Sequence, residues 1–362
     1  CAVSFILRLT AFNLGDHHMN TIKVVGIDIA KSVFQVCVWM ADGSVAWNRK
    51  ISRQKLLHTL RQFPPQTLIA MEACSTSHFW GRALISMGYD VKLIPTQHVK
   101  AFARHQKNDA NDALAICETA CRPGIHFVSV KTTEQQDIKA LRSARQLIVE
   151  QRTALANQLR ALLAEYGVII PAGLQRLQRQ LPEVLEDGDN TITFTLRRLL
   201  SLLREDMQML TERIDVLDKE LAELSSQQVA YHHLLTIPGV GPLIAAAVVS
   251  EVDATQFSSG RELSAWCGLV PRQHSSGGKQ RLSSMTKNGN RNLRTLIIHG
   301  ARAVMRCVQK RDDSLGRWVK AIELRRGFLK ATVALANKLT RIIWRVLTDS
   351  VDSSMNRAFA GS

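Results

Sequence analysis

The cysteines of this sequence lack a regular spacing, and this lack argues against both a disulfide framework and a zinc site. The 362 residues contain seven cysteines, an odd number at scattered positions, so no disulfide framework is implied. Cys117 and Cys121 lie four residues apart on an expected helix, but a zinc site needs two further ligands at compatible spacing. We therefore expect buried free thiols in a reducing cytoplasm. The other cysteines are Cys1, Cys37, Cys74, Cys267 and Cys307.

Acidic residues are nearly missing from one segment near the C-terminal end of the chain. Between Arg272 and Arg345 there are 18 Lys and Arg residues but only three acidic residues. Almost all of the net charge of +16 therefore comes from this segment. A surface of one sign predicts a polyanionic partner. Nucleic acid fits better than a membrane, because no basic amphipathic helix lies beside a membrane span.

Long hydrophobic runs are also missing. The first 18 residues include an apolar run, Ala2–Leu9, that is too short to span a membrane and lacks a small-residue cleavage pattern. Met19 directly precedes the first expected strand, so residues 1–18 are interpreted as an upstream or non-native extension. The overall composition, with 46% hydrophobic and 22% charged residues, is typical of a soluble globular protein with two or three domains.

Residues 19–128 alternate between predicted strands and helices, which is typical of an α/β domain. The predicted strands are 23–29, 33–39, 45–51, 67–72 and 89–94, and the predicted helices between them are 53–62 and 77–87.

Residues 129–229 have the pattern of two long helices. In the second, all nine a and d positions of a seven-residue repeat from Leu196 to Leu224 are apolar, which predicts a coiled coil. Pro171 and residues 182–189 interrupt the pattern between the helices. A stripe of this length either folds back on the first helix or pairs with another chain. We expect a homodimer or homotetramer.

Four acidic residues suggest a metal site. Asp28 lies in the first strand, Glu72 ends a later strand, and Asp109 and Asp112 share one face at an expected helix start. Acids converging at strand ends provide oxygen ligands for Mg²⁺ or Mn²⁺, and two such ions can clamp the oxygens of a phosphate displacement. The structural alternative is that Asp109 caps its helix and Asp28 serves a turn. The order strand, strand, helix favours a catalytic metal site.

Two glycine-containing segments lie at or near the basic segment 272–345. Residues 237–242 resemble the hairpin of helix-hairpin-helix elements, in which glycines let backbone amides approach phosphate; the alternative is a plain turn. Residues 267–279 place serines between a proline and two glycines, which usually indicates a flexible loop. A serine there is either a phosphate contact or a nucleophile, and composition leaves both open. The predicted nucleic-acid contacts are Gly239, Gly241, Arg272, Lys279, Arg281, Lys287, Arg291 and Arg294.

Together these segments resemble the DEDD-type insertion-sequence transposases, whose relatives include the Piv invertase and guide-RNA-directed bridge recombinases. The resemblance covers residues 20–347. Its motifs are Gly26–Lys31, Met71–Ala73, Lys107–Ala113, Ile237–Gly241, Gly268–Pro271, Ser276–Gly277 and Lys287–Asn290.

The resemblance implies an α/β domain of the RNase H or RuvC type at 19–128, with the catalytic, metal-binding tetrad Asp28, Glu72, Asp109 and Asp112. A coiled coil would follow at 129–229, and a mainly α-helical transposase domain at 230–348. Ser276, the serine directly before Gly277, matches the catalytic nucleophile, with Ser275 beside it. Residues 349–362 would form a flexible tail.

The function implied is that of a bacterial, cytoplasmic, nucleoid-associated DNA transposase. It would cut and rejoin double-stranded DNA at the element junction and target through a metal-assisted serine, directed by a structured guide RNA. One alternative is a metal-dependent, structure-specific endonuclease resembling Holliday-junction resolvases, which activates water and needs no serine. Another is a non-catalytic nucleic-acid-binding protein, although acids near phosphates argue against it.

Overall fold

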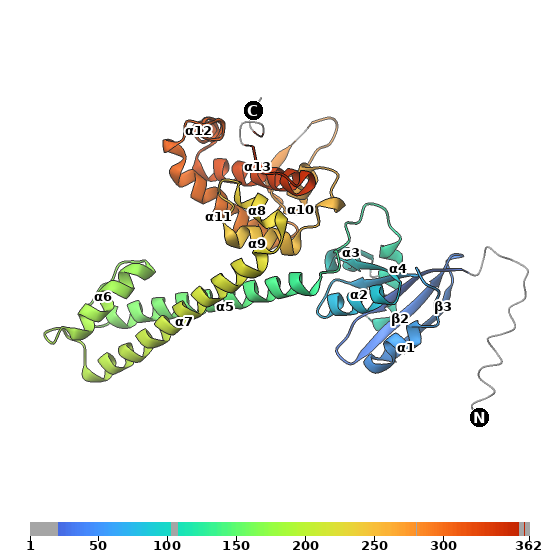
Figure 1. Cartoon of the computed structure of the whole chain (residues 1–362), viewed down its shortest axis with the longest axis horizontal. Helices are drawn as coiled ribbons and strands as arrows, with labels where there is room; N and C mark the ends of the chain where they lie inside the picture. The colour runs from blue at the N-terminus through green and yellow to red at the C-terminus, as the bar shows by residue number, and fades with distance from the viewer. Residues whose placement is uncertain (1–20, 103–107, 280, 355–357, 359–362) are drawn as a thin grey trace, which may run out of the picture. The chain divides into compact units, whose positions relative to one another are not determined.

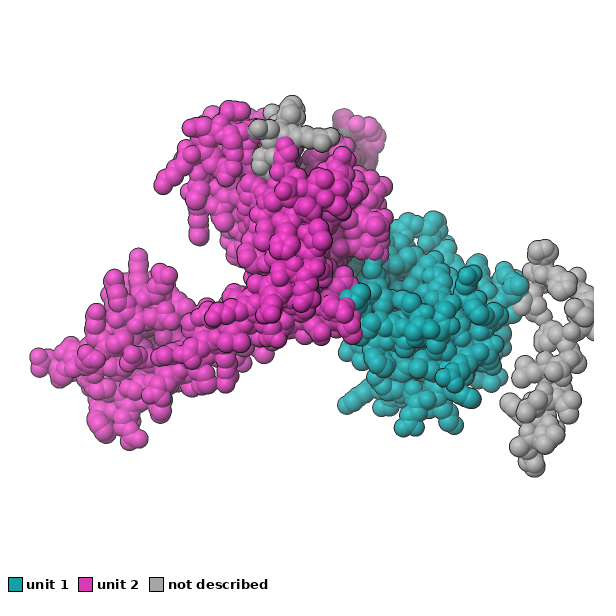
Figure 2. All heavy atoms as spheres, viewed as in Figure 1, with its two compact units in different colours: residues 1–132 teal, residues 133–362 magenta. Residues whose placement is uncertain are grey.

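The chain folds into two compact units, residues 1–132 and 133–362 (Figure 2). This boundary falls a few residues after position 128, where the sequence predicted the end of the first domain. The predicted extension at residues 1–18 lies outside the described part of the chain. The computed structural model describes residues 21–102, 108–279, 281–354 and 358 (Figure 1).

Unit 1 is built on a five-stranded mixed sheet with strand order β3-β2-β1-β4-β5. The first three strands are antiparallel neighbours, whereas β4 is parallel to β1 and β5 is parallel to β4. All five predicted strands are confirmed. They are β1 (Ile22–Asp28), β2 (Val33–Met40), β3 (Val45–Ser52), β4 (Leu68–Glu72) and β5 (Asp90–Ile94).

The alternation of side chains along β1 divides the core of unit 1 in two. Val25 and Ile27 belong to one apolar cluster, with side chains of α1 and α2, whereas Val24 belongs to another, with side chains of α3 and α4. Helices therefore cover both faces of the sheet. The six described cysteines are free, but only Cys37, Cys117 and Cys267 are buried, whereas the sequence predicted buried thiols throughout. The helices are η1 (Arg53–Lys55), α1 (Leu56–Leu60), α2 (Ser77–Ser86), α3 (Thr96–Phe102) and α4 (Asp109–Ala120).

Unit 2 begins with two long antiparallel helices, α5 (Thr133–Ala164) and α7 (Phe194–Ser226), which lie side by side in Figure 1. Arg145 of α5 forms an ion pair with Asp218 of α7, and Arg152 of α5 donates a hydrogen bond to Thr211 of α7 at 3.3 Å. Later residues of α5 therefore contact earlier residues of α7, as in an antiparallel pair. One half of the α7 stripe is therefore covered within the chain. Its buried members are Leu196, Leu200, Met207, Ile214 and Leu221, whereas Leu203, Leu210, Leu217 and Leu224 are half-buried.

A helix that the sequence did not predict, α6 (Leu174–Glu186), lies between α5 and α7 in the chain. The sequence placed a break at Pro182, but this proline lies inside α6. A proline in a helix costs about 3 kcal/mol because it removes a hydrogen bond and crowds the preceding turn. Leu177 and Leu181 offset this cost, since both are buried in a core shared with α5 and α7.

The rest of unit 2 packs around α9 (Pro242–Glu251), whose residues 244–250 are all buried. No helix among the described residues is long and apolar enough to cross a membrane. The surrounding elements are α8 (Val229–Leu235), η2 (Ala254–Gln256), α10 (Gly260–Trp266), β6 (Pro271–Gln273), β7 (Leu282–Met285), α11 (Arg291–Cys307), η3 (Val308–Lys310), α12 (Ser314–Arg326) and α13 (Phe328–Asp349).

Part of the predicted flexible tail is attached to the domain. Ser353 Oγ donates to the carbonyl oxygen of Thr236 at 2.8 Å, and the Ser353 amide donates to Thr236 Oγ1 at 2.9 Å. Asp352 pairs with His233 at 2.8 Å. Residues 352 and 353 are therefore bound to the domain, and polar local composition does not reveal partners more than a hundred positions away.

Candidate catalytic and nucleic-acid sites

Asp28 and Glu72 lie at the ends of neighbouring parallel strands. β1 and β4 pair with Ile27 opposite Met71, so the next residues leave the sheet at the same edge. Their charges both reach the Cys74 thiol, whose pKa is raised first by burial and then by Glu72 and Asp28. Two of the four predicted carboxylates therefore lie close together.

Gly26 allows α4 to cross β1 closely. A Cβ atom on Gly26 would lie 2.5 Å from Cys117 Sγ and 2.6 Å from the carbonyl oxygen of Ala113. Any larger residue would push the helix away from the strand. The helix that begins with Asp109 is thus fixed against the strand that ends with Asp28.

The first turn of α4 is tied to the sheet at the level of Asp28. Asn108 caps the helix by accepting a hydrogen bond from the amide of Asn111 at 2.8 Å, so Asp109 is not the capping residue. Asp109 instead pairs with Lys50 at 3.0 Å. Lys50 and Asp28 share one row of the sheet, because both lie opposite the same residue of β2.

The four acids have the donor chemistry of a divalent-cation site without being gathered around one point. Carboxylate oxygens are the ligands that Mg²⁺ and Mn²⁺ prefer. Within the described ranges, however, no three His, Cys, Asp or Glu side chains are close enough to hold one ion. Asp109 is 59% exposed and engaged with Lys50. The four acids fit a divalent metal ion in two respects: they supply oxygen ligands, and Asp28 and Glu72 lie at adjacent strand ends.

A basic groove along β3 was missed in the sequence. It has a volume of about 450 Å³ and is lined by Trp47, Arg49 and Lys50 among others. The guanidinium of Arg49 lies 5.5 Å from the centre of the Trp47 ring, within cation–π distance. A signal was present, because residues 43–71 include five Lys and Arg and no acid. Through the pair of Lys50 with Asp109, the groove borders the acidic edge.

Residues 237–242 form a tight turn between α8 and α9, and its two glycines differ. Gly239 has a φ of +86°, and a Cβ there would lie 2.7 Å from the carbonyl oxygen of Gly300 in α11. Close packing against α11 therefore explains why position 239 is a glycine. Gly241 faces open space, since apart from its own chain neighbours no described atom lies within 4 Å of the position its Cβ would take.

Ser276 lies at the tip of a β-hairpin, not in the flexible loop that the sequence predicted. β6 and β7 are antiparallel, and between them in the chain Ser276 and Lys279 pair through an isolated antiparallel β-bridge. Between them Gly277 and Gly278 have φ of +56° and +75°. Two successive positive φ values characterise a type I′ turn, which glycine adopts without steric cost. The glycine pair therefore makes a defined turn.

The two adjacent serines differ in their hydrogen bonds. Ser275 Oγ accepts a hydrogen bond from Gln273 Nε2 at 2.9 Å. The hydroxyl of Ser276 has no hydrogen-bond partner among the residues that the structure describes, and its side chain is exposed. Ser276 therefore presents the hydroxyl that is open to a substrate.

Arg294 does not belong to the surface on which the sequence placed it. Its side chain is buried, and its guanidinium donates to the carbonyl oxygens of Cys267 at 3.0 Å and Asn288 at 3.1 Å. A buried cation bound to backbone carbonyls holds the base of the hairpin. The sequence-based prediction that Arg294 contacts nucleic acid assumed that every cation of the segment is exposed. Arg294 instead lies on the buried side of α11, with Leu293 and Ile297.

A mostly buried polar network joins three helices beneath the hairpin. Glu251 of α9 pairs with Arg142 of α5, and their side chains are only 11% and 9% exposed. The other oxygen of Glu251 accepts a hydrogen bond from Asn290 Nδ2. Asn290 also caps α11 by accepting from the amide of Leu293 at 3.0 Å. The start of α11 is thereby anchored to α5 and α9.

The remaining predicted nucleic-acid contacts are exposed cations on the hairpin and at the start of α11. Their positive charge surrounds the segment that carries Ser276, where it would attract phosphate. They are Arg272, Lys279, Arg281, Lys287 and Arg291.

Comparison with known families assigns both units. A model described as the transposase IS116/IS110/IS902 family matches residues 231–315, which include the α8–α9 turn and the serine hairpin. A DEDD-type transposase model of the IS110 group matches residues 25–168, which include all four acids.

Individual relatives match almost the whole chain. The transposase for insertion sequence element IS1111A of Coxiella burnetii is 42% identical over 94% of both chains. A probable family 20 transposase of Pseudomonas aeruginosa is 41% identical over 90% of this chain and 96% of its own. The transposase for insertion sequence element IS1328 of Yersinia enterocolitica is 36% identical over 91% and 98%.

These matches define an insertion-sequence transposase, an enzyme that cuts and rejoins DNA. The chain belongs to the IS116/IS110/IS902 family of transposases. The DEDD domain implies an RNase H or RuvC-like fold, with which the mixed five-stranded sheet agrees.

Proposed function

We propose that this transposase cuts DNA with the hydroxyl of Ser276 and rejoins it through a covalent protein–DNA intermediate. The observation that carries the proposal is the position of Ser276 at the tip of an exposed hairpin, with its hydroxyl open while that of Ser275 is engaged. A tight turn on an anchored base holds a nucleophile in a limited range of positions. That restriction lowers the entropic cost of reaching the reacting geometry.

In the proposed step, Ser276 Oγ attacks a DNA phosphorus. The Oγ–P bond forms while the bond from phosphorus to a deoxyribose oxygen breaks. The serine proton passes to a base or to solvent, and the departing deoxyribose oxygen gains a proton. Rejoining is the reverse, with a deoxyribose hydroxyl of another strand displacing the serine. One phosphoester is exchanged for another in each step, so no external energy source is needed.

The carboxylates of Asp28, Glu72, Asp109 and Asp112 would hold Mg²⁺ or Mn²⁺. When bound, such an ion stabilises the negative charge on a reacting phosphate. The parallel pairing of β1 and β4 supports this assignment, because it places two hard oxygen donors together. The basic groove along β3 would bind DNA phosphates beside this edge.

Two nucleic-acid partners are proposed: double-stranded DNA at the element junction and target, and a structured guide RNA. The exposed cations around the serine hairpin support phosphate binding, which both partners offer. The resemblance to guide-RNA-directed recombinases supports the RNA. Sequencing of RNA that copurifies with the protein tests it, and a random mixture of cellular transcripts would contradict a guide.

A homodimer or homotetramer would form through a coiled coil on the less buried half of the α7 stripe. The half-buried leucines of that stripe stand beside an outer row of exposed apolar residues at seven-residue spacing, which is typical of a helix with a second partner. The outer row is Leu202, Met209 and Val216.

The decisive experiment compares Ser276→Ala with Ser275→Ala as the matched control. Ser276→Ala should eliminate both the covalent protein–DNA adduct and the recombined product while leaving DNA binding intact, whereas Ser275→Ala should keep substantial activity. Denaturing gels of end-labelled DNA measure both products. If Ser276→Ala cuts normally and the wild type forms no adduct, the enzyme attacks with water, as a resolvase-like endonuclease does.

A further inference from the structure

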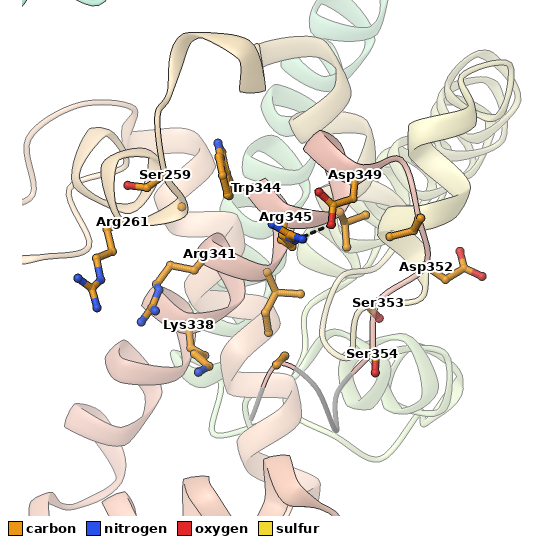
Figure 3. A pocket seen from close by; sticks show the side chains of 15 residues that line it. Ser259, Arg261, Lys338, Arg341, Trp344, Arg345, Asp349, Asp352, Ser353 and Ser354 are labelled. Atoms are coloured by element: carbon orange, nitrogen blue, oxygen red, sulfur yellow. Dashed lines mark ion pairs between the residues drawn. The ribbon is translucent and has the colours of Figure 1, made fainter. Parts of the chain in front are cut away.

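A basic pocket lies between α10 and α13 of unit 2. Its volume is about 740 Å³, within the range of sites for small organic ligands. Arg261 of α10 and Lys338, Arg341 and Trp344 of α13 line it, and residues 351–354 form another part of its wall (Figure 3).

Gly260 brings the cations of this pocket together. A Cβ atom on Gly260 would lie 2.9 Å from both the Cα atom and the carbonyl oxygen of Arg341, so α10 meets α13 where no side chain fits. The next residue, Arg261, therefore lies near Arg341. Lys338 precedes Arg341 by three positions, on the same helical face. Figure 3 shows the charged ends of all three on one side of the pocket.

The acids of the pocket are engaged with other partners. Asp349 forms an ion pair with Arg345, and Asp352 pairs with His233 at 2.8 Å. Neither acid is thus committed to the three cations at the other side.

Two of the three cations have no described carboxylate to balance their charge. Within the described structure, neither Arg261 nor Arg341 has a carboxylate partner. Burial lowers the pKa of Lys338, and the neighbouring charge of Arg341 lowers it further. Like charges held together repel, and an anion entering the pocket would relieve that repulsion.

An aromatic ring also lines the pocket. Trp344 lines the pocket, and its Nε1 donates to the carbonyl oxygen of Phe257 at 3.2 Å, which fixes the ring. Cations next to an aromatic wall are typical of sites for unpaired nucleotides, where phosphate meets charge and a base rests on a ring. A duplex does not suit a concave pocket, because its bases are stacked inside and its phosphates lie on a convex surface.

We propose that this pocket binds an unpaired nucleotide of a nucleic-acid strand, with its phosphates at Arg261, Lys338 and Arg341 and its base against Trp344. The inference rests on the proposed function, because it supposes a strand that the transposase holds or opens. It adds a binding site outside both the acidic edge and the serine hairpin. The shared chemistry is a single-stranded phosphodiester, and RNA and DNA are separated by the test.

The test measures fluorescence anisotropy with labelled oligonucleotides of about 12 residues, namely single-stranded RNA, single-stranded DNA and duplex DNA. All proteins carry Ser276→Ala, so cleavage does not contribute. Arg261→Ala with Arg341→Ala should weaken single-strand binding at least ~10-fold. The slope of log K against log salt should become shallower by about 1.4, since each lost phosphate contact removes about 0.7. Duplex affinity should stay within ~2-fold, because duplex phosphates bind elsewhere.

The charge-matched control is Arg325→Ala with Arg326→Ala, two exposed residues at the end of α12. Equal losses in the two double variants would mean that only overall charge matters, and this overturns the proposal. Unchanged single-strand affinity, or equal losses for single strand and duplex, also overturns it. A selective single-strand loss supports it, and the larger loss identifies RNA or DNA. If wild type never recombines DNA but the selective loss remains, the proposed function fails and the pocket stands.

Discussion

Glu251→Ala should destabilise unit 2 strongly, because the Glu251 carboxylate binds two partners and is mostly buried. Glu251 neutralises Arg142 and accepts a hydrogen bond from Asn290. Breaking a buried ion pair from one side costs about 3–5 kcal/mol, since the remaining charge has lost its partner. The two side chains are 9% and 11% exposed, so some water reaches them. We therefore expect a loss near the lower end, about 3 kcal/mol.

Urea unfolding followed by circular dichroism measures this loss. With a slope of about 3 kcal/mol per molar urea, the midpoint should fall by about 1 M. Asp312→Ala is the control, because Asp312 is 99% exposed and its pair with Lys320 should contribute less than about 0.5 kcal/mol. Arg142→Met with Glu251→Leu should recover part of the stability, since apolar residues of similar size replace buried pairs well, whereas Asn290 still lacks its acceptor. A loss for Glu251→Ala no larger than that for Asp312→Ala would refute the reasoning.

Two further outcomes are expected. Asp28→Asn should abolish strand cleavage in Mg²⁺ while nucleic-acid affinity stays the same or rises, because a negative charge near the phosphates is removed. Cleavage gels measure the first effect and fluorescence anisotropy the second. Normal cutting by this variant would mean that the Asp28 carboxylate is structural. Met209→Asp with Val216→Asp should convert an assembled protein into monomers, as measured by light scattering, since unpaired charges resist burial. The control Lys219→Asp, at an exposed position, should leave the assembly intact. A monomeric wild-type protein would show that α7 is covered only within its own chain.

The α/β unit was predictable because its signals are local. β-Branched and apolar runs identify the strands, and a turn sequence separates β2 from β3. Glu72 closes such a run and Asp28 lies one residue before the end of another, so their meeting at one edge follows once β1 and β4 are neighbours. The pair between Lys50 and Asp109 was not predictable, because it depends on how far α4 slides along the sheet.

The C-terminal unit was harder to predict because its signals are ambiguous or distant. Gly277 and Gly278 fit a flexible loop and a type I′ turn equally well, and both strands of the hairpin are largely exposed, so no alternation of apolar residues marks them. Arg294 lies among exposed cations in the sequence, yet it faces the interior. Which side of α11 faces inward is decided by α9 and α13, far away in the chain.

Glycines beside functional residues have a role that the sequence motifs do not reveal. Gly26 lets α4 lie against the strand of Asp28, and Gly260 lets α10 approach α13 so that Arg261 reaches the basic pocket. Gly289 has a φ of +83°, and a Cβ there would lie 1.8 Å from the carbonyl oxygen of Trp266. At each place the missing side chain brings two backbones together and thereby positions a polar neighbour. A glycine in such a motif therefore identifies where backbones meet, and the ligand-binding group is to be sought in the residues next to it.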